Sequence, residues 1–395
     1  MKYIVLFLSL LTAYAGFSKN STWSVINEKG ETEFSLDASF VYPFNKGVAK
    51  VYKSMFIHSQ WMKAYGYVDK TGKNIIPFAF DQAQDFVAEV TWVRKIGELK
   101  YTLIDKEGNE IPTKKYNRVG AFSGEQNDLC AVFSGEKMGF VNTKGEEVIP
   151  CIYKGAQTFQ DGLVSVMLAD DPAYQYGFID KAGEVVIPLE YKNTGMRLFN
   201  DNMAIVVVKG KTIIIDRDGK KVFKTRKGKM HSVGYGLVSV ITKPDSKGWG
   251  WVDMKNKYVI EPIYDYATPF NEDGYAIVEK NGLKGLIDTT GKELLSCVYD
   301  MVYGNPTEDG FLLGVYPGKA TTALVDAKKD YFDANFNKIV FKNAKQVNGA
   351  NGSDLMSFTG VDNLMGFMNR SYEVIIPATY KKVYPFNEGL AWVRN

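Results

Sequence analysis

The stretch Tyr65-Gly66-Tyr67-Val68-Asp69-Lys70-Thr71-Gly72-Lys73-Asn74-Ile75-Ile76-Pro77 returns in recognisable form along most of the chain. The slot that begins with its Gly reads in the same way from Gly139 to Pro150, from Gly177 to Pro188 and from Gly366 to Pro377. Each copy places an aromatic and an aliphatic residue before an Asp or Asn, then a short polar turn, then an aliphatic run that ends in Pro. This repeated pattern decides the fold.

The copies are regularly spaced. Aligned on the Asp or Asn, they occur ten times at intervals of 35 to 43 residues, at Asn27, Asp69, Asp105, Asn142, Asp180, Asp216, Asp253, Asp288, Asp326 and Asn369. A regular period in this range predicts a tandem repeat architecture rather than two or three ordinary domains.

Each copy contains three segments with the pattern of β-strands. The first ends at the Asp, which favours the start of a type I turn, and the Gly three residues later accepts the left-handed conformation that reverses the chain. The second ends in Pro, which marks a strand end or edge because Pro has no N–H for a ladder. The third follows a connection that carries one Phe, and it reads Gly-Leu-Ala-x-Val or a variant, as in Gly389-Leu390-Ala391-Trp392-Val393.

We therefore predict an all-β protein of about ten three-stranded antiparallel units, stacked as an open superhelical β-solenoid. The alternative is a closed, propeller-like ring, in which the first strand at Trp23–Asn27 would pair with the last strand at Leu390–Val393. Ten units exceed the four to eight blades usual for a ring, which favours the solenoid. Residues 16–395 are expected to form one array, with units starting near residues 23, 65, 101, 138, 176, 212, 249, 284, 323 and 365, and with a degenerate unit at 323–364.

The N-terminus has the features of a secretory signal peptide. Lys2 precedes an apolar run from Ile4 to Leu11, and Ala13-Tyr14-Ala15 offers small residues at the two positions that a signal peptidase reads. We expect cleavage after Ala15 and a secreted, periplasmic or cell-surface location. No later run approaches the roughly 20 apolar residues of a spanning helix, so we do not expect a membrane-spanning protein.

The charge of the chain bears on the kind of partner that it could bind. The formal net charge is only +3, and the basic residues are dispersed, which argues against nucleic acid as a partner.

The chain has three cysteines. Cys151 and Cys297 occupy the same slot four units apart, too far for a disulfide in a linear array, whereas Cys130 and Cys151 lie in successive units and could meet. Three small buried apolar side chains are the favoured interpretation.

The pattern resembles the bacterial WG repeat, also called the KWG repeat. Its consensus runs Lys-Trp-Gly-aromatic-Ile-Asp-Lys-x-Gly-Lys-x-Val-Ile-Pro-x-x-Tyr and ends with Phe-x-x-Gly-Leu-Ala-x-Val. The Trp-Gly pair is present at Trp249-Gly250, whereas in other copies the Trp slot holds Tyr65, Met138, Tyr176, Lys284 and Met365. The resemblance implies an extracytoplasmic or surface repeat protein that acts in binding, in a family mostly without an assigned biochemical activity.

The recurring residues invite functional interpretations that their physical chemistry does not favour. The repeated Asp could serve catalysis or calcium binding, but a turn such as Asp69-Lys70-Thr71-Gly72 lacks the alternating oxygen ligands and closing Glu of a calcium loop. The repeated aromatics could form a ladder for sugar rings, yet units this small need large apolar side chains to pack on their neighbours. We predict turn residues and core residues respectively.

No catalytic constellation is apparent in the sequence. His58 and His231 are the only histidines and lie in different units, which argues against zinc sites and a Ser-His-Asp triad. A glycosidase-type carboxylate pair stays open, because 45 acidic residues offer many pairs and only geometry could select one. We expect no enzyme activity, no cofactor and no metal.

The most informative feature is what varies between the units. Insertions in repeat proteins collect on one face, which is often the binding face. The hairpins that join the third strand to the next first strand vary in length, and they supply our candidate ligand contacts: Phe56, His58, Trp61 and Met62 in one, and Asp170, Asp171 and Tyr174 in another.

Three hypotheses on function follow. The first is an exported, non-catalytic scaffold that binds a protein or cell-envelope component through its extended surface. The second is a carbohydrate-binding lectin or carbohydrate-active enzyme, for which a glycan would be the ligand. The third is a structural spacer.

Overall fold

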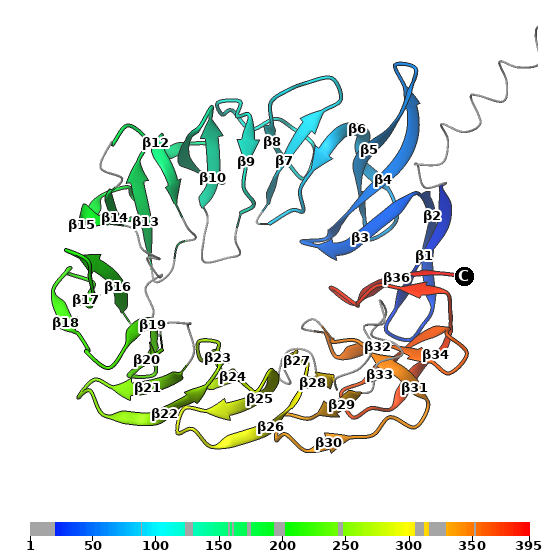
Figure 1. The fold of residues 1–395 in the computed structure, drawn as a ribbon. Coiled ribbons are helices and arrows are strands. Elements are labelled where there is room, and N and C mark those ends of the chain that lie inside the picture. Colours follow the sequence, from blue (N-terminus) through cyan, green and yellow to red (C-terminus); the bar gives the residue numbers. More distant parts are fainter. Residues whose placement is uncertain are drawn as a thin grey trace, which may run out of the picture. The chain divides into compact units, whose positions relative to one another are not determined.

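The chain folds entirely into β-structure. The computed structural model describes residues 20–87, 89–122, 129–156, 159, 162–171, 175–192, 202–243, 248–304, 312–315, 329–350 and 353–395, and all regular elements in these ranges are strands (Figure 1). The described residues contain no helix that could cross a membrane. By its internal contacts the chain divides into two compact units, the first comprising Met1–Ala131, Asn142–Glu146 and Asn343–Asn395, and the second Val132–Val141 and Glu147–Lys342.

The first unit contains three antiparallel sheets. One combines both ends of the chain in the order β2 (Thr32–Ala38), β1 (Ser21–Asn27), β36 (Leu390–Arg394) and β35 (Lys382–Val383). The second has six strands in chain order: β3 (Phe40–Asn45), β4 (Val48–Ile57), β5 (Gln60–Asp69), β6 (Asn74–Ala83), β7 (Val90–Lys95) and β8 (Thr102–Asp105). The third consists of β31 (Ala344–Val347), β32 (Leu355–Gly360), β33 (Met365–Asn369) and β34 (Val374–Tyr380).

A ten-stranded sheet follows in the chain. Its strands pair in chain order: β9 (Arg118–Val119), β10 (Leu129–Ser134), β11 (Lys137–Asn142), β12 (Glu147–Ala156), β13 (Leu163–Leu168), β14 (Gln175–Asp180), β15 (Val185–Lys192), β16 (Met203–Val208), β17 (Lys211–Asp216) and β18 (Lys221–Phe223).

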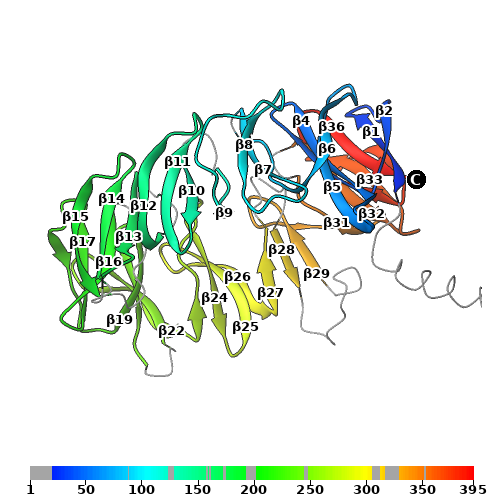
Figure 2. The ribbon, with the colours of Figure 1, turned by 90° about the horizontal axis from the view of Figure 1, so that it is seen from above.

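The three remaining sheets belong to the second unit, and each is a four-stranded antiparallel meander (Figure 2). The first is β19 (Lys229–Gly234), β20 (Leu237–Ile241), β21 (Trp249–Asp253) and β22 (Tyr258–Tyr264). The second is β23 (Tyr266–Ala267), β24 (Tyr275–Lys280), β25 (Leu283–Asp288) and β26 (Glu293–Tyr299). The third is β27 (Met301–Tyr303), β28 (Leu312–Val315), β29 (Lys329–Phe332) and β30 (Lys338–Ile339).

The sheets correct the expected unit of three strands. Each four-stranded sheet takes the third segment of one sequence copy and the first two segments of the next, and it gains a fourth strand from the connection that precedes the third segment. This strand is as short as two residues in β23 and β35. A two-residue strand is too short to show alternation, so the sequence pattern could not reveal it.

Buried rings hold neighbouring sheets together, as the sequence predicts for the recurring aromatics. In the first unit, Trp392 of β36 is fully buried and stacks on Phe44 of β3, with ring centroids 5.7 Å apart and an interplanar angle of 4°. The other face of that sheet packs on β32–β34 through Ile26, Phe367 and Phe386. The Phe of the connection is buried in most of the described copies: Phe44, Phe86, Phe122, Phe159 and Phe386.

The two ends of the chain meet in one sheet. Strand β1 pairs antiparallel with β36, with Ser24 opposite Val393 and Ile26 opposite Ala391. The C-terminal end of the chain therefore supplies the first two strands of this sheet, β35 and β36, and the N-terminal end supplies the other two, β1 and β2. The order is the one found in β19–β22. This is the pairing of terminal strands that the closed alternative predicts.

The repeated Asp or Asn forms the turn that the sequence predicts. In the stretch from Tyr65 to Pro77, Asp69 Oδ1 accepts hydrogen bonds from the backbone N–H groups of Thr71 at 2.9 Å and Lys73 at 3.0 Å, and Gly72 N–H donates to the Asp69 carbonyl. Asn27 makes the same pair of contacts with Lys29 and Glu31, both at 3.0 Å. Partial burial raises the pKa of Asp69, but hydrogen bonds from Thr71 and Lys73 outweigh it, and the pKa lies below its ordinary value.

A further turn of this kind lies at Asp333, seven residues after Asp326 of the sequence alignment, and Asp326 itself falls outside the described residues. Asp333 Oδ1 accepts from the N–H groups of Asn335 and Asn337, both at 2.8 Å. The fourth position holds Phe336 with φ 60° instead of Gly, which removes the sequence signal that marks most other copies.

The Gly after the Trp slot is required by a close approach of backbones. A Cβ on Gly250 would lie 2.6 Å from the carbonyl oxygen of Ile260 and 2.7 Å from the nitrogen of Pro262. The register between β21 and β22 shifts at this point, where β22 bulges toward Gly250. Gly66 meets the same obstacle, at 2.7 Å from the carbonyl oxygen of Ile76.

We predict that Gly250→Ala lowers the free energy of unfolding by about 2 kcal/mol or more, because the added methyl group collides with rigid backbone. The matched control is Gly155→Ala in β12, where a Cβ has no neighbour within 4 Å. The control should change stability by less than about 0.5 kcal/mol. Urea denaturation followed by tryptophan fluorescence measures both, and equal losses in the two variants would contradict the assignment.

We also predict that Asp69→Asn preserves stability within about 0.5 kcal/mol, whereas Asp69→Ala costs about 1 kcal/mol because two backbone N–H groups lose their acceptor. Because the pKa of Asp69 is lowered in the folded protein, its carboxylate contributes stability above the unfolded pKa, and that contribution is lost as the pH falls through the folded pKa. Acidification should therefore shift the comparison in favour of the Asn variant. An Asn variant as unstable as the Ala variant at neutral pH would show that the turn needs the charge and not the acceptor.

Candidate functional site

The β4–β5 hairpin, predicted from its irregular length, extends beyond the neighbouring strands of its sheet (Figure 1). Both strands have ten residues, and the turn at His58 and Ser59 has positive φ angles of 49° and 63°, as a two-residue type I′ turn requires. Phe56 is 61% exposed and His58 is exposed, while Trp61 and Met62 are half-buried. The structure thus brings these four predicted contact residues together at one hairpin tip.

Side-chain pairing connects the tip to the core. Phe56 is opposite Trp61, and their rings lie 5.7 Å apart. Four residues toward the core on the same face, Tyr52 is opposite Tyr65, with ring centroids 5.3 Å apart. Paired rings on one face of a two-stranded ribbon support it where no neighbouring strand does. The aromatic pairs therefore continue from the sheet to the tip of the hairpin.

The second predicted loop lies in the other compact unit. Asp170 pairs with Lys137 at 2.6 Å, with 81% of the Asp170 side chain exposed, and Asp171 accepts a hydrogen bond from the N–H of Gln175 at 2.9 Å. Tyr174 lies outside the described residues. Both aspartates therefore make contacts within the second unit, and an exposed ion pair of this kind adds little stability.

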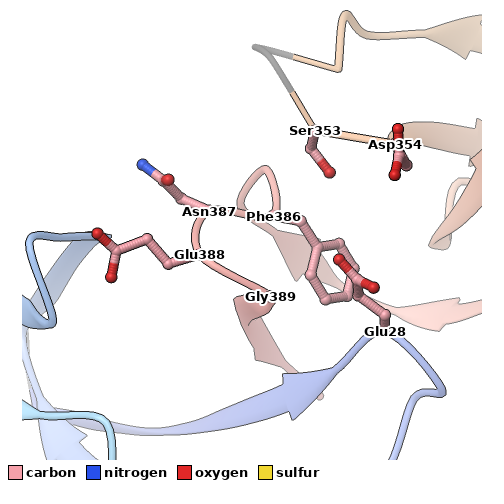
Figure 3. Close-up of a pocket in the computed structure, with 7 residues that line it drawn as sticks. All are labelled: Glu28, Ser353, Asp354, Phe386, Asn387, Glu388 and Gly389. Carbon is pink, nitrogen blue, oxygen red and sulfur yellow. The ribbon is translucent and has the colours of Figure 1, made fainter.

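A polar pocket of about 230 Å³ in the first unit is lined by Glu28, Ser353, Asp354, Phe386, Asn387, Glu388 and Gly389 (Figure 3). Its carboxylates do not converge, because Glu388 points away from Glu28 and Asp354. Glu388 instead binds Lys70 at 3.1 Å and accepts from the Gly47 N–H at 2.9 Å. Partial burial raises the pKa of Glu388, but these two contacts outweigh it, so the pKa lies below its ordinary value.

An aromatic cluster beside the terminal sheet carries several cations, and the sequence did not reveal it. Phe40 of β3 stacks on Tyr52 at 5.8 Å and meets the ring of Tyr384 edge-on at 5.8 Å. Lys382 and Arg394 lie over the neighbouring rings. Burial raises the pKa of Tyr384 to about 12. The cluster joins residues more than 300 positions apart in the sequence, which no local pattern could indicate.

The remaining reactive groups are dispersed. Cys130, Cys151 and Cys297 are free thiols, and burial raises the pKa of Cys130 to about 12, which leaves it protonated and unreactive. Cys130 accepts a hydrogen bond from the indole of Trp92 at 3.2 Å. Within the ranges that the structure describes, no cluster of His, Cys, Asp and Glu could hold a metal ion.

Comparisons with solved structures give weak similarity. A eukaryotic initiation factor is 10% identical, with 82% of this chain and 96% of that chain covered and a TM-score of 0.45. Dihydro-heme d1 dehydrogenase NirN in complex with DHE is 12% identical, with coverages of 76% and 73% and a TM-score of 0.38. Apo AztD from Citrobacter koseri is 12% identical, with coverages of 81% and 94% and a TM-score of 0.32. Similarity at this level supports no conclusion about function.

Sequence comparison is more specific. No curated protein matches the chain significantly. The family model described as the WG containing repeat matches six segments, at residues 65–97, 138–170, 176–211, 249–283, 285–313 and 365–395. These segments start close to the unit boundaries expected from the sequence, and the Gly of the family's Trp-Gly pair is the residue that the bulge at Pro262 requires. The chain belongs to the WG repeat family.

Proposed function

We propose that this protein is an exported, non-catalytic repeat scaffold that binds a protein or cell-envelope component. The observation that carries the proposal is the β4–β5 hairpin, whose tip exposes Met55 and Phe56 to solvent, Phe56 by 61%. The corresponding strands elsewhere have five or six residues, as in β20 and β21 or β24 and β25, against ten in β4 and β5.

The extra length of the hairpin is unfavourable for the isolated chain. It exposes apolar side chains and orders residues that pack on no other strand of the sheet. A rigid aromatic side chain held in solvent is a typical anchor of a binding interface, because it enters a partner's pocket with little loss of conformational entropy. The paired rings of Phe56 and Trp61 thus suit contact with a partner.

The burial of the recurring rings supports the scaffold over a lectin built on a repeated aromatic ladder. The ring before the turn is buried in the described copies, including Tyr67, Phe140, Phe178, Trp251 and Phe367. Rings in this slot pack between strands and sheets, so their faces are not free for sugars.

The proposal of export rests on the signal-peptide pattern of the N-terminal segment from Lys2 to Ala15.

We also propose that the repeat array is closed rather than an open solenoid. Three contacts within the first unit support closure: the pairing of β1 with β36, the stacking of Trp392 on Phe44, and the contact of Glu388 with Gly47. The last of these repeats an internal arrangement, because Tyr235, at the equivalent position before a turn Gly, donates to the carbonyls of Asn271 at 2.8 Å and Glu272 at 2.6 Å in the next sheet. A junction made like the internal junctions is what a closed array requires.

The hairpin test replaces residues 55–62 by Asn-Gly, which joins the register partners Ser54 and Lys63 through a two-residue turn and keeps the strand pairing. We expect the shortened protein to fold normally and to lose the ligand that the wild-type protein captures from envelope extract or on a glycan array. Val361→Ser is the matched control, because Val361 is a 69% exposed apolar residue of the same unit outside the hairpin. Equal capture by all three proteins would refute the role of the hairpin.

The closure test introduces cysteines at Ser24 and Val393, which are register partners on β1 and β36, in a variant without the native cysteines. A closed array should form the intramolecular disulfide on mild oxidation, and mass spectrometry should find the two peptides linked in the monomer. The Ser24→Cys variant alone controls for intermolecular linkage. An open array of this many units would leave the two thiols unlinked in the monomer.

A further inference from the structure

Two cations face each other across the last pair of strands. Lys382 of β35 and Arg394 of β36 are direct partners in the antiparallel register, and both side chains are half-buried. Like charges in this position destabilise a sheet, because the side chains of directly opposite residues lie close together on one face. Burial lowers the pKa of Lys382, and the positive charge of Arg394 lowers it further.

The other sheets show that this charge pair is not a property of the repeat. The next pair of residues along these two strands is apolar in each of four sheets. The pairs are Val383 with Val393 in this sheet, and Val41 with Val51, Met230 with Val240 and Ala267 with Val278 in the others. In three of them, the position equivalent to the Lys382–Arg394 pair joins Phe40 with Tyr52, Lys229 with Ile241 and Tyr266 with Glu279. Strand pairing therefore does not demand two cations at this place.

Aromatic rings enclose the two cations. The Lys382 ammonium lies 5.7 Å from the ring centroid of Trp23, 5.3 Å from that of Phe40 and 5.1 Å from that of Tyr384. The Arg394 guanidinium lies 5.1 Å from the ring centroid of Trp23. Rings attract cations but leave N–H donors pointing away from the ring face. They also cover part of each half-buried cation, and partial burial strengthens the attraction of the site for a negative charge.

No acidic side chain neutralises either cation within the part of the chain that the structure describes. Lys50, a neighbour in the same cluster, is paired with Asp85 at 3.0 Å, whereas Arg394 donates to the hydroxyl of Ser21 at 3.5 Å. Two adjacent cations thus share an aromatic enclosure with a neutral hydroxyl as their polar neighbour.

We propose that Lys382 and Arg394 form a binding site for an oxyanion, namely a carboxylate or phosphate group of a ligand. Arg394 supplies a planar fork of donors that matches either group, and Lys382 adds a second charge from the opposite strand. The anion removes the repulsion between the two cations, and the Ser21 hydroxyl is a third donor. The site is separate from the hairpin tip, and its test does not depend on the function of the hairpin.

The experiment measures binding of inorganic phosphate and of glucuronate to the full chain by calorimetry and by thermal unfolding, with chloride holding the ionic strength constant. Lys382→Met and Arg394→Met keep the apolar stems on the rings and remove the charge. Lys227→Met is the matched control, because Lys227 also lies over a ring, 3.9 Å from the centroid of Tyr258, and belongs to the other compact unit. The two anions distinguish a phosphate ligand from an acidic sugar.

We expect saturable binding of at least one anion to the wild-type protein, with a rise in melting temperature. Affinity should fall roughly tenfold or more in Lys382→Met and Arg394→Met, which corresponds to the loss of one charge-assisted contact, and should not change in Lys227→Met. Absence of binding to the wild-type protein, or an equal loss in Lys227→Met, would overturn the proposal. If one site variant fails to fold, the other carries the comparison with the wild-type protein, and failure of the wild-type protein to bind either anion still overturns the proposal.

Discussion

The structure depends on the inability of a four-stranded sheet to bury its own faces. Each sheet presents large apolar side chains on both faces, and a sheet in isolation would leave them in water. In the first unit the terminal sheet covers one neighbour with Trp23 and Trp392 and the other with Ile26, Val393 and Ala391. Truncating a ring as buried as Trp392 removes contacts on which two sheets rely, so its cost is about 3 kcal/mol or more.

This dependence explains why the chain ends need a partner. An end strand with open hydrogen-bonding groups and an uncovered apolar face is prone to aggregate. Here β1 supplies the edge that β36 needs, and Glu388 ties the last turn to Gly47 and Lys70. The terminal sheet is thus completed by antiparallel strand pairing, as the other sheets are, and its last turn is held by side-chain contacts.

The sequence predicted those features that short-range chemistry determines. The Asp69 turn follows from one side-chain acceptor and one Gly within four residues, and the buried rings follow from their recurrence in one slot. The short strands such as β35 escaped detection because two residues carry no periodicity. The reason for Gly250 was equally hidden, because its neighbour Pro262 lies on the next strand, and only the register places the two together.

The candidate site shows the same division between local and distant information. The hairpin at Phe56 and Trp61 was predictable because both strands are continuous in sequence and merely longer than their counterparts. The pair Lys382 and Arg394 was not, since each residue taken alone is an ordinary charged residue of a short strand. Their significance arises when β1 brings Trp23 against both cations, across a separation of more than 350 residues. Lys382 and Arg394 stand outside the apolar pair that recurs between these strands, Val383 with Val393 in this sheet, so their side chains can change without disturbing that packing. That freedom is a physical reason to look for specificity at the terminal sheet rather than in the slots that recur.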